Sequence, residues 1–409
     1  MKILVMTSTF SRWVGDTEPR FVDDLCQRLS EHHQVDVLAP HAPMAAQTEQ
    51  MGKVSVFRFR YCFDRWEQLA YDGGILPNLK ANRLRLLLVP LFILAQLRAL
   101  IKLLRENHYD AIHAHWIIPQ GLTAILASKF LRSPPPVVLT SHGGDLFSLK
   151  GSVLAQLKRW ICRGATHLIV VSSAMKAKAA ETGLKPDEEI SVVPMGTDST
   201  RFTPRPVSTS RSGLLFVGRL VDKKGVEYLI DAMPRVLAQF PHEQLTVIGD
   251  GTLRHSLEAR TRERGVAERV TFLGALPNHE IPRHLQRAAV LVFPSIVTES
   301  GDQEGTPVAI MEALACGCAC VVSDYPGVRD IILENHTGLL APQRSAEALA
   351  TQIISLLRNP EQARELGEAG RKHVTANYDW RVIESRFSTI FHTLSVYSSP
   401  PAAQTPPHQ

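Results

Sequence analysis

The chain lacks the glycine-rich loop that a dinucleotide-binding enzyme carries after its first strand. Residues 7–16, which follow the first predicted strand, contain a single glycine, Gly15, where a Gly-x-Gly-x-x-Gly pattern would be needed. Because that loop forms the pyrophosphate cradle, its absence argues against a nicotinamide-dependent oxidoreductase. The lysine loop of the P-loop nucleotidases is missing as well.

Cysteine is scarce, with 6 residues in 409, and its spacing fits neither a disulfide framework nor a zinc site. Cys316, Cys318 and Cys320 run from a predicted helix end into a strand, so they cannot close a tetrahedron around one metal ion. We therefore expect the cysteines to be small buried side chains in a reducing compartment.

Long apolar runs and a strong net charge are also missing. The longest apolar run, residues 86–95, is about half of the ~20 residues that span a bilayer, and residues 1–7 do not look like a signal peptide. The net charge of +5, without a basic run among aromatic residues, permits anionic ligands but does not indicate nucleic-acid binding. We expect a cytoplasmic chain that does not cross the membrane.

The length of the chain and its alternation of strands and helices predict two α/β domains, each with a parallel sheet. The expected strands are 2–7, 35–39, 54–59, 110–114, 136–140, 167–171 and 190–193 in the first half, and 214–218, 245–249, 269–273, 289–294 and 318–323 in the second. We expect domains at 1–202 and 214–380, joined by a proline- and serine-rich hinge at 203–213. A last helix, about 381–396, precedes a proline-rich disordered tail at 398–409.

A basic turn follows the predicted strand that ends at Gly218. Ligands of open α/β sheets collect at the carboxyl ends of strands, which is where Arg219 and Lys224 lie in the sequence. An arginine fork and a lysine point charge together can neutralise a diphosphate. The alternative is a solvated basic turn without a ligand.

Two carboxylates flank the start of a predicted helix at 307–316, with Pro307 in its first turn and Gly317 just beyond its end. Glu304 precedes this helix and Glu312 lies on its second turn, so one can face a sugar ring and the other a ribose diol. The free N–H groups between them suit a diphosphate. The alternative is that both glutamates are ordinary solvated residues.

The first half places polar residues and glycines after another strand, at residues 141–145. His142 is a candidate donor to a sugar hydroxyl there, although a lone histidine is more often structural. His113 and His115 alternate along a strand and therefore share a face, which allows packing or an acceptor contact. A metal site is disfavoured, because no third ligand is apparent nearby.

Taken together, these motifs resemble those of glycosyltransferase family 4, over nearly the whole chain. They are 216–225, 249–251, 272–274 and the Glu304 and Glu312 pair in the second half, and 111–115, 142–145, 171–173 and 193–198 in the first. Met195, Cys318 and Asp330 depart from the usual pattern. The resemblance implies a GT-B fold, with two Rossmann-like domains whose parallel sheets face each other across a cleft.

The resemblance also implies roles for individual residues. Arg219 and Lys224 would hold the diphosphate, Glu304 the donor sugar, His142 a hydroxyl of that sugar and Glu312 the ribose. The remaining expected donor-binding residues are Gly15, Gly218, Gly305 and Thr306. Transfer would retain the anomeric configuration and require no metal or other cofactor, and the last helix would cross back onto the first domain.

We therefore expect a retaining glycosyltransferase that moves a sugar from a nucleoside-diphosphate sugar to a glycan or lipid-linked acceptor, in cell-surface polysaccharide or glycolipid synthesis. Two alternatives stay open: a nucleotide-sugar-binding scaffold without turnover, and a sugar-nucleotide epimerase.

Residues 81–107 carry basic side chains around an apolar run that Pro90 should kink or divide. This pattern favours peripheral contact with an anionic membrane, although an ordinary domain helix has the same apolar face.

Overall fold

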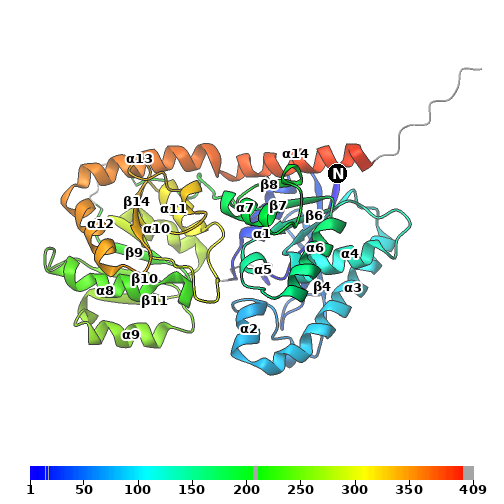
Figure 1. Cartoon of the computed structure of the whole chain (residues 1–409), viewed down its shortest axis with the longest axis horizontal. Helices are drawn as coiled ribbons and strands as arrows, with labels where there is room; N and C mark the ends of the chain where they lie inside the picture. Colours follow the sequence, from blue (N-terminus) through cyan, green and yellow to red (C-terminus); the bar gives the residue numbers. More distant parts are fainter. Residues whose placement is uncertain (14, 17, 206–210, 399–409) are drawn as a thin grey trace, which may run out of the picture.

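The chain forms two α/β units that lie side by side (Figure 1). Its last two helices follow one another along the top of the view, α13 (Pro360–Asn377) over the C-terminal unit and α14 (Trp380–Ser398) over the N-terminal unit. The computed structural model describes residues 1–13, 15, 16, 18–205 and 211–398. The predicted disordered tail, apart from Ser398, and the middle of the predicted hinge lie outside the described residues. Ser398 itself is the last residue of α14 (Trp380–Ser398).

The N-terminal sheet has the strand order β3-β4-β2-β1-β5-β6-β7-β8. Its strands are β1 (Lys2–Met6), β2 (Gln34–Pro40), β3 (Thr48–Met51), β4 (Val54–Phe59), β5 (Ala111–His115), β6 (Val137–Ser141), β7 (His167–Val170) and β8 (Ile190–Val192). Its helices are α1 (Phe21–Leu29), α2 (Ile75–Ala81), α3 (Leu88–Glu106), α4 (Leu122–Ser128), α5 (Gly144–Phe147), α6 (Ser152–Gly164) and α7 (Ser173–Glu181). The predicted strands of this sheet pair in parallel, and the edge strand β3, which was not predicted, is antiparallel to β4.

The C-terminal sheet is parallel throughout, in the order β11-β10-β9-β12-β13-β14. Its strands are β9 (Leu214–Val217), β10 (Leu245–Ile248), β11 (Val270–Gly274), β12 (Val290–Phe293), β13 (Ala319–Asp324) and β14 (Leu339–Pro342). Its helices are α8 (Val226–Leu237), α9 (Arg254–Glu263), α10 (Ile281–Arg287), α11 (Val308–Ala315), α12 (Ala346–Arg358) and α13 (Pro360–Asn377). The expected two-domain α/β architecture is therefore confirmed.

Each sheet has its own hydrophobic core, because its central strands are apolar on both faces and are covered by helices on both sides. Where the chain passes from one domain to the other, residues from one half of the sequence pack in the core of the other half. Phe202 packs in the C-terminal core, whereas Trp380, Phe387 and Phe391 of α14 pack in the N-terminal core. A Cβ on Gly196 would lie 2.6 Å from the Trp380 ring, so glycine allows this helix to sit flush on the first domain.

Helix α3 and the short 3-10 turn η2 (Arg83–Leu87) before it expose several leucine side chains. By length and composition Arg83–Glu106 could span a membrane, which the sequence did not lead us to expect. However, one face of α3 packs on the N-terminal core through Phe92, Leu100 and Leu103. The helical segment is divided between η2 and α3, at residues 87 and 88. Pro90 lies after this division, in the first turn of α3.

Candidate active site

The predicted basic turn lies where β9 ends, and close backbone contacts fix its shape. Gly218 donates its N–H to the carbonyl of Ile248 at 2.9 Å. Gly225 adopts a left-handed conformation with φ of +59°, and a Cβ there would lie 2.2 Å from the carbonyl oxygen of Pro294. The turn is thus held against the end of β12, and its end at Gly225 tolerates no side chain.

Lys224 and Glu304 form a mostly buried ion pair, which the sequence did not predict. Lys224 Nζ lies 3.0 Å from Glu304 Oε2, and Lys223 Nζ lies 3.6 Å from Glu304 Oε1. Burial alone would raise the pKa of Glu304, but the charges of Lys224 and Lys223 outweigh it and hold that pKa at about 2. Lys224 also lies over the ring of Phe293, 4.4 Å from its centroid. Glu304 is therefore ionised at neutral pH. It forms an ion pair with Lys224, the lysine that we expect to bind the diphosphate.

Arg219 extends in a different direction, toward the N-terminal domain. Its Nη1 donates to the carbonyl of Gly73 at 2.7 Å, and its side chain is exposed. Its charge still contributes to lowering the pKa of Lys224, after the larger effect of burial. Arg219 and Lys224 thus both act on the charge of Glu304, but of these two predicted cations only Lys224 contacts the carboxylate.

The loop that carries Glu304 touches the other domain at its next two residues. A Cβ on Gly305 would lie 2.6 Å from the carbonyl oxygen of His142, and Thr306 Oγ1 donates to the carbonyl of Val171. Gly143, with φ of +105°, packs against Gly305 from the opposite side. The structure thus brings the two glycine-containing turns together, although they lie far apart in the sequence.

The Pro307 prediction needs a small correction. Pro307 has extended backbone angles and precedes α11 rather than sitting in its first turn. The predicted left-handed glycine beyond the other end is confirmed, because Gly317 adopts φ of +65° and the N–H of Cys318 donates to the carbonyl of Ala313 at 2.9 Å. Helix α11 therefore starts one residue later and ends one residue earlier than expected.

His142 is part-buried and surrounded by aromatic rings. Its Nε2 lies 2.9 Å from Nδ1 of His115, while Phe21 and Trp116 pack on it with centroids at 5.0 and 4.9 Å. His113 and His115 do share a face, with ring centroids 4.2 Å apart, and both are fully buried. Of the two alternatives for that pair, packing is the one the structure supports.

Glu312 lies in a second group of side chains, and its neighbours there were not predicted from the sequence. It is buried, hydrogen-bonded to Asn278, and influenced by the charges of Arg201 and Asp24. Arg201 Nη2 is buried too, and no described residue accepts a hydrogen bond from it. These partners come from separate loops and from α1, so no local motif connects them. The solvated alternative for Glu312 is excluded.

Burial raises the pKa of Glu312 to about 8, with Arg201 opposing the shift. A carboxyl whose folded pKa is raised stabilises the fold below its unfolded pKa and loses that contribution as pH rises through its folded pKa. We therefore expect Glu312→Gln, which cannot ionise, to match the wild type near pH 5 and to be the more stable protein at pH 8.5. Urea unfolding at both pH values measures this, and an equal difference at both would contradict it.

Gly15 lies in the loop after β1, as predicted, in an open position with φ of +88°. Arg12 in the same loop pairs with Asp16 at 2.8 Å and with Asp72 at 3.3 Å. Asp72 immediately precedes Gly73, whose carbonyl accepts the hydrogen bond from Arg219. The loop after the first strand is therefore connected to the basic turn of the other domain through two residues.

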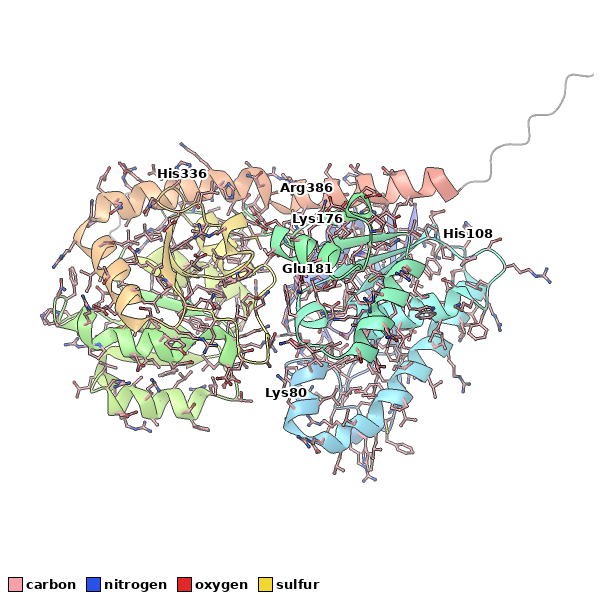
Figure 2. All side chains as sticks on the ribbon, viewed as in Figure 1. Lys80, His108, Lys176, Glu181, His336 and Arg386 are labelled. Atoms are coloured by element: carbon pink, nitrogen blue, oxygen red, sulfur yellow. The ribbon has the colours of Figure 1, made fainter. Side chains whose placement is uncertain are left out.

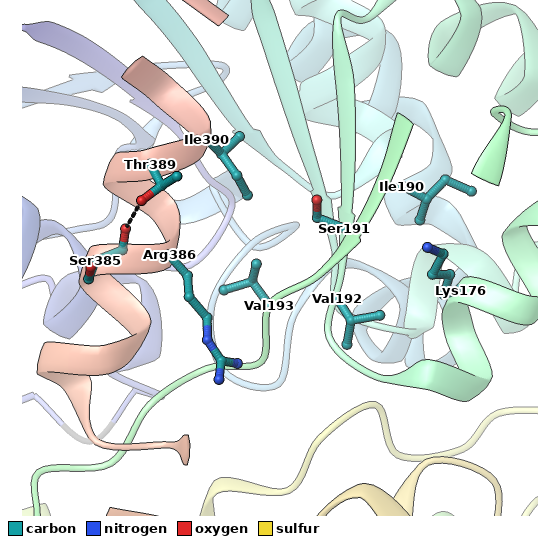
Figure 3. Close-up of a pocket in the computed structure, with 9 residues that line it drawn as sticks. All are labelled: Lys176, Ile190, Ser191, Val192, Val193, Ser385, Arg386, Thr389 and Ile390. Carbon is teal, nitrogen blue, oxygen red and sulfur yellow. Dashed lines mark hydrogen bonds between the residues drawn. The ribbon is translucent and has the colours of Figure 1, made fainter. Parts of the chain in front are cut away.

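Two other features lie outside this group of residues. A groove of about 560 Å³ between β8 and α14 is lined by Lys176, Arg386 and neighbouring side chains, none of which was predicted for the site (Figure 3).

His41, Asp64 and Glu67 come close enough to suggest a metal site. However, both His41 nitrogens already bond, to Glu67 and to the carbonyl of Ala45, and Arg60 pairs with Asp64. The donor set does not fit a resident metal.

Comparisons with known proteins agree with the motifs. Residues 19–201 match the model of Glycosyltransferase Family 4, and residues 204–373 match that of Glycosyl transferases group 1. The chain is 30% identical over 292 residues to the glycogen synthase of Mycobacterium tuberculosis, covering 69% of this chain and 68% of that one. It is 29% identical over 300 residues to the GDP-mannose-dependent alpha-(1-6)-phosphatidylinositol monomannoside mannosyltransferase of Mycolicibacterium smegmatis, covering 71% and 78%.

Among solved structures, the sucrose-phosphate synthase of Thermosynechococcus elongatus superposes with a TM-score of 0.77. The match covers 97% of this chain and 99% of that one at 22% identity, so it supports the fold alone. The two family matches together take in nearly every motif described above. The chain belongs to glycosyltransferase family 4 and is a glycosyltransferase with the GT-B fold.

Proposed function

We propose that this enzyme transfers a sugar from a nucleoside-diphosphate sugar to a hydroxyl of a glycan or lipid-linked acceptor, with retention of the anomeric configuration. The observation that carries the proposal is the group of Arg219, Lys224 and Glu304 at the end of β9. It combines two cations for the diphosphate with an ionised carboxylate for the sugar. The relative named for its dependence on GDP-mannose supports a donor of this class.

In this mechanism the residues act mainly through charge. Lys224 and Arg219 stabilise the negative charge that develops on the departing diphosphate, which is the largest effect available to a preorganised site. Glu304 holds Lys224 in place and accepts hydroxyl hydrogen bonds from the donor sugar. Glu312, whose carboxyl is mostly protonated at pH 7, can donate one hydrogen bond and accept another at the ribose diol. The two cations take the charge-neutralising role that a metal has in other transferases, so we propose that none is required.

The test is transfer itself. The purified enzyme is incubated with a panel of UDP-, GDP- and ADP-sugars and candidate acceptors, in chelator, and the anomeric configuration of the product is read by NMR. We expect one donor class to give a retained glycoside. Binding of a donor without turnover would favour a scaffold, and a changed donor sugar in the absence of acceptor would favour an epimerase. Either result would overturn the proposal.

We also propose that the enzyme works at the inner face of the cytoplasmic membrane, where a lipid-linked acceptor would be found. The segment η2–α3 exposes apolar side chains to an unusual degree, with Leu84, Leu87 and Leu94 at 73%, 75% and 57%. Only 28% of the most apolar part of Arg83–Glu106 is buried. An exposed apolar strip of this kind marks an interaction surface.

The charges around this strip fit an anionic lipid surface. The exposed cations on α2, η2 and α3 are Lys80, Arg83, Arg98, Lys102 and Arg105. Figure 2 labels Lys80 on α2, at the lower end of the N-terminal domain. Each basic residue near such a surface contributes about 1 kcal/mol of attraction, while the leucines bury apolar area in the interface.

The expected result is that vesicles containing acidic lipid retain the protein at low salt and release it as salt is raised. The double variant Leu87→Asp/Leu94→Asp should lose about tenfold in vesicle binding, because it places two charges in the apolar strip. Leu333→Asp is the control, since Leu333 is an exposed leucine of the other domain, at 41%. Sedimentation with vesicles measures binding. Failure of the wild-type protein to bind at low salt would contradict the membrane proposal.

A further inference from the structure

Three imidazoles lie in a row beneath the candidate sugar site. His113 and His115 come from β5, and His142 follows β6. His113 Nε2 lies 2.7 Å from Thr140 Oγ1, and His115 Nδ1 lies 2.9 Å from His142 Nε2. The rings of His115 and His142 are nearly parallel, at 7°, and their centroids are 5.1 Å apart. Because that separation is much larger than the 2.9 Å between the two nitrogens, the contact lies close to the ring planes. His142 is the outermost member and the only one that is not fully buried.

The hydrogen atoms of this row can be counted. All three pKa values are lowered by burial, those of His113 and His142 to about 3, so the rings are neutral at pH 7. A neutral imidazole has one N–H and one bare nitrogen. Only one hydrogen can therefore lie between His115 Nδ1 and His142 Nε2, and the ring that donates it fixes the tautomer of both.

The surroundings of His115 distinguish the two arrangements. Its other nitrogen, Nε2, is buried and has no hydrogen-bond partner among the described residues. If His142 donated, His115 would carry its hydrogen on Nε2 as a buried N–H without an acceptor, which is rare in proteins. If His115 donates from Nδ1, its Nε2 is a bare acceptor, and a missing bond at an acceptor is tolerated more often. The second arrangement is the less costly one.

We infer that His115 is a positioning residue that donates from Nδ1 to Nε2 of His142 and so holds His142 in the tautomer with its hydrogen on Nδ1. The inference rests on the proposed function, in which His142 meets a hydroxyl of the donor sugar. Because Nε2 of His142 is occupied by His115, Nδ1 is the nitrogen left for a ligand. His142 then presents its Nδ1–H as a donor to an oxygen of the donor sugar. It therefore favours sugars that have a hydrogen-bond acceptor at that position.

Nitrogen NMR of the whole enzyme labelled with ¹⁵N-histidine tests the tautomer directly, without any substrate. Signals are assigned by comparison with His142→Asn and His115→Asn variants. We expect His142 to show a protonated Nδ1 and a bare Nε2. In His115→Leu this preference should be lost, whereas His167→Asn, which changes a histidine bonded to Ser191 instead, should leave it intact. A protonated Nε2 on His142 in the wild type would overturn the inference.

Activity gives a second and separate readout. The amide nitrogen of asparagine can replace Nδ1 of histidine as a donor, whereas leucine offers none. We expect His115→Leu to lower kcat by about tenfold and His115→Asn to recover most of that loss. Equal losses in both variants, with unchanged unfolding midpoints, would contradict the positioning role. If no donor is turned over at all, the NMR result still decides the tautomer, so failure of the proposed function and failure of this inference are distinguishable.

Discussion

Lys224→Ala is expected to lower turnover by about a thousandfold and also to destabilise the fold. The loss of turnover follows because a preorganised charge next to the leaving diphosphate is removed. The loss of stability follows because Glu304 is left mostly buried without its closest partner, which typically costs about 3 kcal/mol. The ion pair between Lys224 and Glu304 is what adds the effect on stability. Steady-state kinetics and urea unfolding measure the two effects.

A second substitution separates stability from chemistry. Adding Glu304→Gln to the Lys224→Ala variant removes the buried charge that has lost its closest partner, so the free energy of unfolding should recover by about 2 kcal/mol. Turnover should stay low, because neither the cation nor the carboxylate is restored. Recovery of turnover together with stability would mean that Lys224 acts only by keeping the fold intact, and the proposed role in charge stabilisation would be wrong.

Arg219→Ala should lower turnover by about a hundredfold and leave the free energy of unfolding unchanged. Arg219 is exposed, and its side chain donates a hydrogen bond to a backbone carbonyl of the other domain, that of Gly73. An exposed contact of this kind contributes little to folding, whereas the guanidinium fork next to Lys224 matches two phosphate oxygens. Kinetics at saturating donor and acceptor, beside thermal unfolding, measure both quantities.

The matched control for this variant is Arg254→Ala. Arg254 lies in the same domain and pairs with Asp250 and Glu258, and it has no role in the proposed site. Its replacement should change turnover by less than about twofold, as expected for a surface ion pair. Equal effects of the two arginine substitutions would show that Arg219 contributes only to the general positive field of the domain.

Most of the fold could be predicted because the central strands are short runs of β-branched and apolar residues between helical patterns. The two missed strands lacked that signal. Strand β3 (Thr48–Met51) is polar at an antiparallel edge, and β14 (Leu339–Pro342) is four residues long and ends in proline. Edge strands are stabilised by pairing with a neighbour more than by their own composition, so their sequences carry less information.

The candidate site was predictable wherever it depends on strand ends. Arg219, Lys224 and His142 all follow strands of parallel sheets, and such positions converge in α/β folds. What could not be predicted is which of these side chains contact each other. The Lys224 and Glu304 pair, the approach of Arg219 to Gly73 and the placement of Arg201 by Glu312 all depend on how distant loops pack. No spacing along one sequence encodes such contacts.

The measurement that tests the account most directly is a crystal structure of the enzyme soaked with a nucleoside diphosphate, using UDP, GDP and ADP in turn. We expect the diphosphate oxygens to lie within hydrogen-bond distance of Arg219 and Lys224, with the ribose hydroxyls at Glu312. Density for the nucleotide elsewhere, such as the groove where Lys176 and Arg386 lie between β8 and α14 (Figure 3), would contradict the account.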